Sequence, residues 1–273
     1  MRVWLDGAVL EDDQARISVR DHGLTVGDGV FETMKVTAGV PFAMGRHLAR
    51  LDDSASRLGL RAPDAADLRA AASELIAAHD PGEVGRLRIT VTGGNGPAGT
   101  ERGGAAPTVL MVVGPGSTWP PSAALATVPW ARNERSAVAG AKTTSYAENV
   151  VALAHAKKRG AAEALFYDTR GNLCEGTGSN LFLVVDGALL TPALSTGCLA
   201  GVTRGLVIEW SGALEEELGA SSVDRASEVF ITSSTRDVQP VHAVDGRMYA
   251  VPGPVTAAAM ATFASRSGAD TDP

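Results

Sequence analysis

Cysteine and long apolar runs are scarce in this sequence, and their scarcity argues against several kinds of protein. Only two cysteines occur in 273 residues, and Cys174 and Cys198 form neither a metal-spaced pair nor a disulfide framework. No apolar run reaches the roughly 20 residues that a membrane helix needs, and no apolar signal segment follows Arg2. We therefore expect a cytoplasmic protein with reduced thiols and no membrane association.

Positive charge is also limited. The formal net charge is −7, which argues against nucleic acid or an anionic membrane as a partner, because both require a basic surface. Only four of the 24 basic residues are lysines, at positions 35, 142, 157 and 158. Arginine stays protonated, whereas a lysine amine can be tuned to attack a carbonyl group. A lysine retained in such an arginine-rich chain is therefore a candidate for chemistry.

Signatures of metalloenzymes, hydrolases and dinucleotide-binding proteins are missing. The five histidines are scattered, with no H-E-x-x-H or G-x-S-x-G motif, so we predict no metal site. Residues 94–99 read G-N-G-P-A-G, which matches the dinucleotide fingerprint in form. That fingerprint requires a helix to open at the glycines, and the following T-E-R-G-G is a poor helix former. We interpret the segment as a mobile loop.

Hairpins and helices follow one another along the chain. In the first half, strands are predicted in RVWLDGAVLE, GVFETMKV, VPFAM, RLRITVTG and PTVLMVVG, and helices in GRHLARLDDSASRLGL and over 65–79. In the second half, strands are predicted in ALATVPWA, EALFYDTRGNLCEG, LFLVVDGALLTP and EVFITSS, and helices in AENVVALAHAKKRG and from Gly201. A hairpin at Asp245-Gly246 precedes a tail, SRSGADTDP, that we expect to be frayed.

This mixture favours an α+β or mixed α/β fold with two domains over a doubly wound nucleotide-binding sheet. We expect a smaller N-terminal α+β domain over residues 1–113 and a larger C-terminal domain over residues 124–273. The segment 114–123 is rich in Pro, Gly and Ser and is the predicted linker.

Four features are candidates for one site. Lys142 lies between A-G-A and a predicted helix, and lysine is rarely buried unless it is paired or tuned. Glu175 follows a strand and Arg50 lies on the first long helix, although a solvated cap and a surface arginine are the simpler interpretations. Residues 201–203, Gly-Val-Thr, open a helix whose N–H groups and hydroxyl suit a phosphate.

The order and context of these features resemble one family. The motifs are GDGVFETMKV, the spaced H-L-A-R-L, K-T-T-S-Y-A-E-N, C-E-G-T-G-S-N-L-F and G-V-T-R. Together they resemble the fold-type IV pyridoxal-phosphate enzymes, which include branched-chain aminotransferases, D-amino-acid aminotransferases and aminodeoxychorismate lyases. The resemblance runs from about Val3 to Gly246, nearly the whole chain.

The resemblance implies pyridoxal 5′-phosphate as the cofactor, held between the two domains of an enzyme that forms homodimers and acts on amino and keto acids. The cofactor-binding residues that it implies are Arg50, Lys142, Glu175, Leu199, Val202, Thr203 and Ser234. Lys142 is then the catalytic residue, which forms the Schiff base and carries the proton, while Glu175 keeps the pyridine nitrogen protonated. Arg50, the helix start and Ser234 bind the phosphate, and Leu199 packs against the ring.

The substrate is less well defined. D-amino-acid aminotransferases place an Arg and a His in the loop where this chain has Ala98 and Thr100. Arg88 is a replacement for binding a carboxylate if its face of the strand RLRIT lines the site; an exposed strand face is the alternative. Aminodeoxychorismate lyases also carry a basic residue at this position, but they have an Arg after the strand where this chain has Gly93-Gly94. Phe31, in GDGVFETMKV, is the second predicted substrate-binding residue.

Three functions follow from these observations. The first is an aminotransferase that moves an amino group from a D-amino acid, or an (R)-amine, to a 2-oxo acid. The second is a lyase that releases pyruvate from 4-amino-4-deoxychorismate to give 4-aminobenzoate. The third is a non-catalytic binding protein, against which the intact Lys142 and Glu175 argue. The branched-chain group is the poorest match, because its aromatic-rich N-terminal pocket is thin in this chain.

Overall fold

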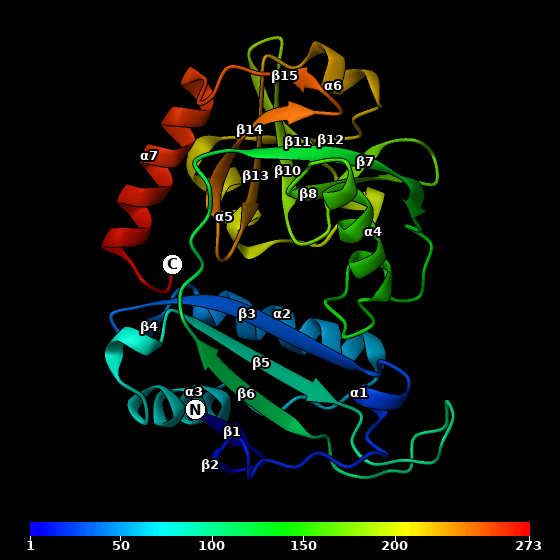
Figure 1. Cartoon of the computed structure of the whole chain (residues 1–273), viewed down its shortest axis with the longest axis vertical. Helices are drawn as coiled ribbons and strands as arrows, with labels where there is room; N and C mark the ends of the chain where they lie inside the picture. Colours follow the sequence, from blue (N-terminus) through cyan, green and yellow to red (C-terminus); the bar gives the residue numbers. More distant parts are fainter. The chain divides into compact units, whose positions relative to one another are not determined.

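The chain folds into two units, each built on its own sheet (Figure 1). The computed structural model describes all residues, 1–273. Unit 1 contains residues 1–117, 141–146 and 271–273, and unit 2 contains residues 118–140 and 147–270. The two-domain, mixed α/β fold class is confirmed. The units depart from the expected domain boundaries at 141–146 and 271–273, because those two short segments pack with the N-terminal unit.

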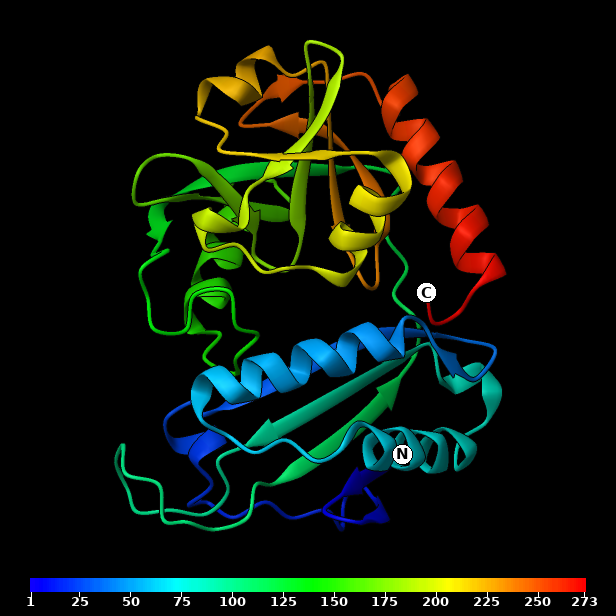
Figure 2. The same ribbon diagram turned by 180° about the vertical axis from the view of Figure 1, so that it is seen from behind.

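Unit 1 is an antiparallel sheet with helices on one side. The strand order is β2-β1-β6-β5-β3-β4, with bounds β1 (Arg2–Leu5), β2 (Ala8–Glu11), β3 (Gly29–Thr37), β4 (Val40–Pro41), β5 (Arg86–Thr92) and β6 (Val109–Gly114). The helices are α1 (His22–Thr25), α2 (Met44–Leu58), α3 (Ala65–Ala77) and the short 3-10 helix η1 (Pro81–Glu83). Figures 1 and 2 show α2 and α3 covering the same face of this sheet.

The core of unit 1 lies between that face and the two helices. Alternation along β5 places Leu87, Ile89 and Val91 in the core, where each is fully buried. The same period along β3 points Val30 and Met34 inward. This period also carries a carboxylate, Glu32, into the buried face, so β3 has one charged position that packing alone does not explain.

Unit 2 has a nine-stranded mixed sheet. Its strands are β7 (Ala123–Arg132), β8 (Glu163–Asp168), β9 (Leu173–Gly176), β10 (Asn180–Val185), β11 (Ala188–Pro192), β12 (Leu214–Glu216), β13 (Glu228–Ser233), β14 (Asp237–Val244) and β15 (Arg247–Met248). The helices are η2 (Leu194–Thr196), α4 (Ala147–Lys158), α5 (Val202–Ser211), α6 (Ser221–Arg225) and α7 (Pro254–Ala269). The order is β12-β11-β10-β13-β14-β7-β8-β9, and β15 pairs with β14 outside this order. A further pairing of β9 with β10 closes six of these strands into a ring.

The end of the chain differs from the sequence-based expectation. The tail SRSGADTDP was expected to be frayed, but residues 265–269 complete α7, whose inner side buries Phe263. Residues 271–273 then hold the start of α2: the carbonyl of Thr271 accepts from the Ala43 amide at 2.7 Å, and Oδ1 of Asp272 accepts from the Gly45 amide at 2.6 Å. Because a helix start has unsatisfied N–H groups, this tail acts as a cap supplied from far along the chain.

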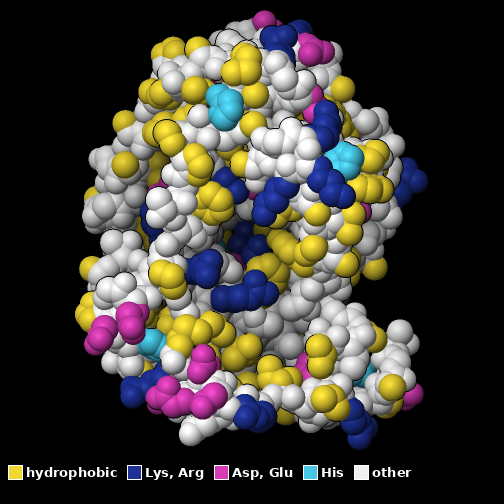
Figure 3. All heavy atoms as spheres, viewed as in Figure 1, with side chains coloured by type: hydrophobic (Ala, Val, Ile, Leu, Met, Phe, Trp, Pro, Cys, Tyr) yellow, Lys and Arg dark blue, Asp and Glu magenta, His cyan; other side chains and the backbone are white.

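No helix combines the length and apolar character needed to cross a bilayer. On the face that Figure 3 shows, basic and acidic side chains form small separate groups between apolar and neutral atoms.

Candidate active site

A short extended segment brings Lys142 to the edge of β3. We call residues 141–146 the strap. The Phe31 amide donates to the Lys142 carbonyl at 3.0 Å, the Thr144 amide donates to the Gly29 carbonyl at 2.8 Å, and the Lys142 amide donates to Oγ of Ser54 on α2 at 3.1 Å. A Cβ on Gly29 would lie 3.0 Å from Oγ1 of Thr144, so the strap approaches as closely as it does only because this residue is glycine.

The side chain of Lys142 lies over the ring of Phe31. Its Nζ is 4.4 Å from the ring centroid, and Cζ of Arg88 is 3.7 Å from the same centroid. The ring of Tyr146 meets Phe31 edge-on, with centroids 5.3 Å apart. One buried aromatic ring therefore contacts two cations, an arrangement in which the ring face offsets part of the cost of removing them from water.

Arg88 is a partly buried cation without an acidic partner. Its Nε donates to Oγ1 of Thr90 at 3.3 Å, and no carboxylate lies within ion-pair distance of its guanidinium. Burial lowers the pKa of Arg88 below its ordinary value; Tyr146 opposes this shift, and the charge of Arg86 adds to it. A guanidinium remains protonated in proteins, so this position favours binding of an anion.

A buried carboxylate, that of Glu32, holds Arg50 in place. Both oxygens of Glu32 accept from Arg50, from Nε at 2.7 Å and from Nη2 at 2.7 Å, and Oε2 also lies 2.6 Å from Nδ1 of His47. Burial is the largest single influence and acts to raise the pKa of Glu32, but the charge of Arg50 and the hydrogen bonds from Arg50 and His47 together lower the pKa to about 2. Burial lowers the pKa of His47, against the pull of Glu32. The two-pronged contact fixes the orientation of the Arg50 guanidinium.

In unit 2, Glu175 lies at the point where β9 meets β10. It pairs with Asn180 across the two strands. Its Oε2 accepts from the Leu199 amide at 2.9 Å, and its Oε1 is 3.3 Å from Nε of Arg132. The carboxylate is only 13% exposed, so its position is set by these partners rather than by solvent.

The start of α5 offers amide donors that no side chain of the helix cap satisfies. Gly201 is the N-cap residue, and it makes no side-chain cap hydrogen bond. A Cβ on Gly201 would lie 2.0 Å from Oδ1 of Asn180, which excludes the Ser, Thr or Asp side chains that usually cap a helix. The amides of Val202 and Thr203 are thereby left for an external anion.

The predicted residues fall into two sets, one in each unit. Unit 1 brings Phe31, Arg88 and Lys142 together and contains Arg50. Unit 2 brings Glu175, Leu199, Val202 and Thr203 together, while Ser234 follows β13.

Four further residues belong to these sets and were missed from the sequence. They are Glu32, His47, Arg132 and Tyr146. Glu32 had a usable signal, since it is charged at a core-facing position of an alternating strand. Arg132 had none, because it is one arginine among many in this chain.

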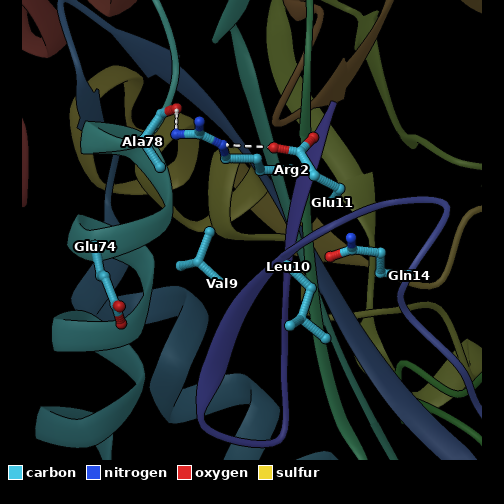
Figure 4. A pocket seen from close by; sticks show the side chains of 7 residues that line it. All are labelled: Arg2, Val9, Leu10, Glu11, Gln14, Glu74 and Ala78. Atoms are coloured by element: carbon cyan, nitrogen blue, oxygen red, sulfur yellow. Dashed lines mark hydrogen bonds and ion pairs between the residues drawn. The ribbon is translucent and has the colours of Figure 1, made fainter.

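Two other features carry no chemistry of this kind. A cavity of about 420 Å³ between the first hairpin and α3 contains none of the predicted residues; Figure 4 shows Arg2 across it, bonded to Glu11 and to the carbonyl of Ala78. No group of three or more His, Cys, Asp or Glu side chains is placed to hold a metal ion.

Known proteins resemble this chain over most of its length. A sequence model of the family described as "Amino-transferase class IV" matches residues 29–244. A Methanocaldococcus jannaschii protein that carries the name of a branched-chain-amino-acid aminotransferase is 33% identical, over 91% of this chain and 89% of its own length. The bifunctional aminodeoxychorismate lyase / D-amino acid transaminase of Mycobacterium tuberculosis is 30% identical, over 90% of this chain and 92% of its own length.

Among solved structures, the 4-amino-4-deoxychorismate lyase of Pseudomonas aeruginosa superposes with a TM-score of 0.85 at 32% identity, covering 99% of this chain and 100% of the lyase. The archaeal similarity runs against our expectation that the branched-chain group matches least. The relatives differ in the reactions for which they are named. This chain belongs to the class IV aminotransferase family.

Proposed function

We propose that this protein is an aminotransferase that moves an amino group from a D-amino acid, and also from (R)-amines, to a 2-oxo acid, with Arg88 binding the substrate carboxylate. The observation that carries this proposal is the guanidinium of Arg88, which is partly buried over Phe31, the ring that Lys142 also contacts, and has no acidic partner. An uncompensated cation of this kind is costly unless an anion joins it. A carboxylate bound by Arg88 would be close to Phe31, the ring that the Lys142 amine contacts.

Enzymes of this family depend on pyridoxal 5′-phosphate, and the donor groups of this chain fit that cofactor. Lys142 supplies a primary amine for its aldehyde, and Glu175 supplies a carboxylate for its pyridine nitrogen. The uncapped amides of Val202 and Thr203 suit its phosphate. We assign further phosphate contacts to Arg50 and Ser234, and a packing contact with the ring to Leu199.

The cofactor, when bound, withdraws electrons from the substrate Cα and so weakens its C–H bond. In our proposal the Lys142 amine first acts as a base and takes the proton from the substrate Cα. It then acts as an acid and gives a proton back, which completes the transfer. Glu175 keeps positive charge on the ring nitrogen. Arg88 and Phe31 fix the substrate so that Cα faces the amine, which is the orienting role that lowers the entropy cost of the step.

The preference for D-amino acids draws support from the M. tuberculosis relative, whose name includes D-amino acid transaminase activity. The relative named for branched-chain substrates makes L-leucine, L-isoleucine and L-valine necessary comparators.

The test is a half-reaction spectrum of the cofactor-loaded enzyme against matched D- and L-amino acids. We expect D-alanine to convert the yellow form into the pyridoxamine form and to yield pyruvate, while L-alanine leaves the band unchanged. Faster conversion by L-leucine than by any D-amino acid would assign the branched-chain reaction instead. Loss of conversion in Lys142→Ala, with cofactor still bound, is the matched control.

The lyase reaction is the second candidate, favoured by the end-to-end similarity to the P. aeruginosa lyase. Arg88 would then bind a carboxylate of aminodeoxychorismate. Release of pyruvate and 4-aminobenzoate without formation of the pyridoxamine form would identify this reaction. A protein with no cofactor absorbance after reconstitution would support the third function, a non-catalytic binding protein.

We also propose a homodimer located in the cytoplasm. Light scattering of the cofactor-loaded protein tests the first part, and a monomeric mass would contradict it. Fractionation of cells that produce the protein tests the second.

A further inference from the structure

The Gly-rich segment between β5 and β6 is a feature that the proposed function leaves unused. We call residues 93–107 the Arg102 loop. It was expected to be mobile, but the structure anchors it at its near end: the Gly96 amide donates to the Arg20 carbonyl at 3.2 Å, and Nε2 of His22 lies 3.1 Å from the Pro97 carbonyl. A third anchor, Arg102, leads toward Lys142.

Arg102 makes four hydrogen bonds from one guanidinium. It donates to both carboxylate oxygens of Asp28, from Nε at 2.7 Å and from Nη2 at 2.6 Å; we call this two-pronged contact the grip. It also donates to the carbonyls of Leu58 at 2.7 Å and Gly59 at 3.0 Å, which end α2. Cations are favoured at a helix C-terminus, and a two-pronged contact with a carboxylate resists rotation. Hydrogen bonding to Arg102 lowers the pKa of Asp28, with burial opposing it.

Asp28 is the middle residue of the turn that holds the strap. The carbonyl before it, of Gly27, accepts from the hydroxyls of Thr144 and Ser145, both at 2.9 Å. The carbonyl after it, of Gly29, accepts from the Thr144 amide at 2.8 Å. Every one of these bonds ends two or three residues from Lys142.

The contacts form a closed circuit. Arg102 links the end of α2 to Asp28, the Asp28 turn links to the strap, and the strap returns to α2 because the Lys142 amide donates to Ser54 at 3.1 Å. A closed circuit holds its members more tightly than the same bonds in an open chain, since no single one can relax without straining the next.

We propose that Arg102 is a positioning residue for Lys142: by holding Asp28 on the end of α2, it keeps the strap in register with β3 and the lysine amine in place. The proposal rests on Lys142 being the reacting amine. It assigns to the Arg102 loop a mechanical role in place of the nucleotide-binding role that its glycines resemble. His22, whose Nδ1 is 3.6 Å from Asp28, is the other basic group at this carboxylate.

The test compares three variants of the cofactor-loaded enzyme by hydrogen exchange and steady-state kinetics. Arg102→Ala removes the grip, Arg102→Lys keeps the charge with a single point of contact, and Arg20→Ala is the control, since Arg20 bonds the same loop at Gly96 without touching Asp28. In Arg102→Ala we expect exchange in residues 141–146 to speed up about 10-fold and kcat to fall about 10-fold, with KM within about twofold of wild type. Arg102→Lys should recover part of both losses, and Arg20→Ala should leave both unchanged.

The proposal would be overturned if Arg102→Ala speeds up hydrogen exchange only in the Arg102 loop and leaves either the exchange of the strap or kcat at the wild-type value. If that variant fails to fold, Asp28→Asn replaces it, because the amide keeps the shape and loses the charge; unchanged strap exchange there has the same meaning. Borohydride reduction and peptide mapping distinguish a failure of the proposed function from a failure of the positioning role of Arg102. A label away from Lys142 removes the proposed function, whereas the exchange result judges the positioning role whatever Lys142 reacts with.

Discussion

Replacing Arg88 by methionine tests whether the cation over Phe31 binds the substrate carboxylate. Methionine keeps an unbranched apolar chain against the ring and removes the charge. A hydrogen bond to a charged group contributes about 1.5–3 kcal/mol, which corresponds to about 10- to 150-fold in binding. Because Arg88 is only partly buried, water offsets some of this, and we expect the KM for D-alanine to rise about 10- to 30-fold.

The assay compares a D-amino acid with an (R)-amine that lacks a carboxylate, in the same enzyme. The KM for the amine should change less than about threefold, because the amine has no group for Arg88 to bind. Arg86→Met is the matched control: Arg86 lies two residues away on the same strand, is exposed, and contacts neither Phe31 nor Lys142. An equal rise in KM for both substrates, or the same rise in Arg86→Met, would refute the assignment of Arg88.

Four further predictions concern the lysine, the acid dependence of stability, the buried carboxylate and the tail. Lys142→Ala should abolish turnover and retain cofactor without a covalent link, and borohydride labelling should fall on no other residue in wild type; near-normal rates would contradict this. Wild-type stability should fall with acid, first as pH drops below the ordinary pKa of His47, 6.5, and again between 4.5 and about 2 as Glu32 protonates, because both folded-state values are lowered; a urea melt flat from pH 7 to 4 would oppose it. Glu32→Gln should leave Arg50 without its charge partner and lower stability by about 3 kcal/mol, read by the same melts. Asp272→Ala should cost about 1 kcal/mol, because it uncaps α2, and an unchanged thermal midpoint would show that the tail does not cap this helix.

Local pattern was sufficient for much of the fold. Alternation predicted β5 and its two faces, and the three- and four-residue spacing of Leu48, Leu51 and Ala55 predicted α2. Helix α7 was not anticipated, because its alanine-rich pattern has little amphipathic contrast and its buried side is defined by what it packs against. The frayed tail was wrong for the same reason: its partners, Ala43 and Gly45, lie more than 200 residues away.

The sequence by itself was sufficient for the family and for a proposal of the chemistry, because Lys142, Glu175 and the glycine at the start of α5 are recognised by residue type and local context. Only the tertiary structure decided how those groups are held. The strap beside β3, the Glu32 carboxylate under Arg50, and the Arg102 grip on Asp28 all join residues that are distant along the chain. Such contacts depend on which surfaces meet after folding, and local patterns in a single sequence do not predict which surfaces these are.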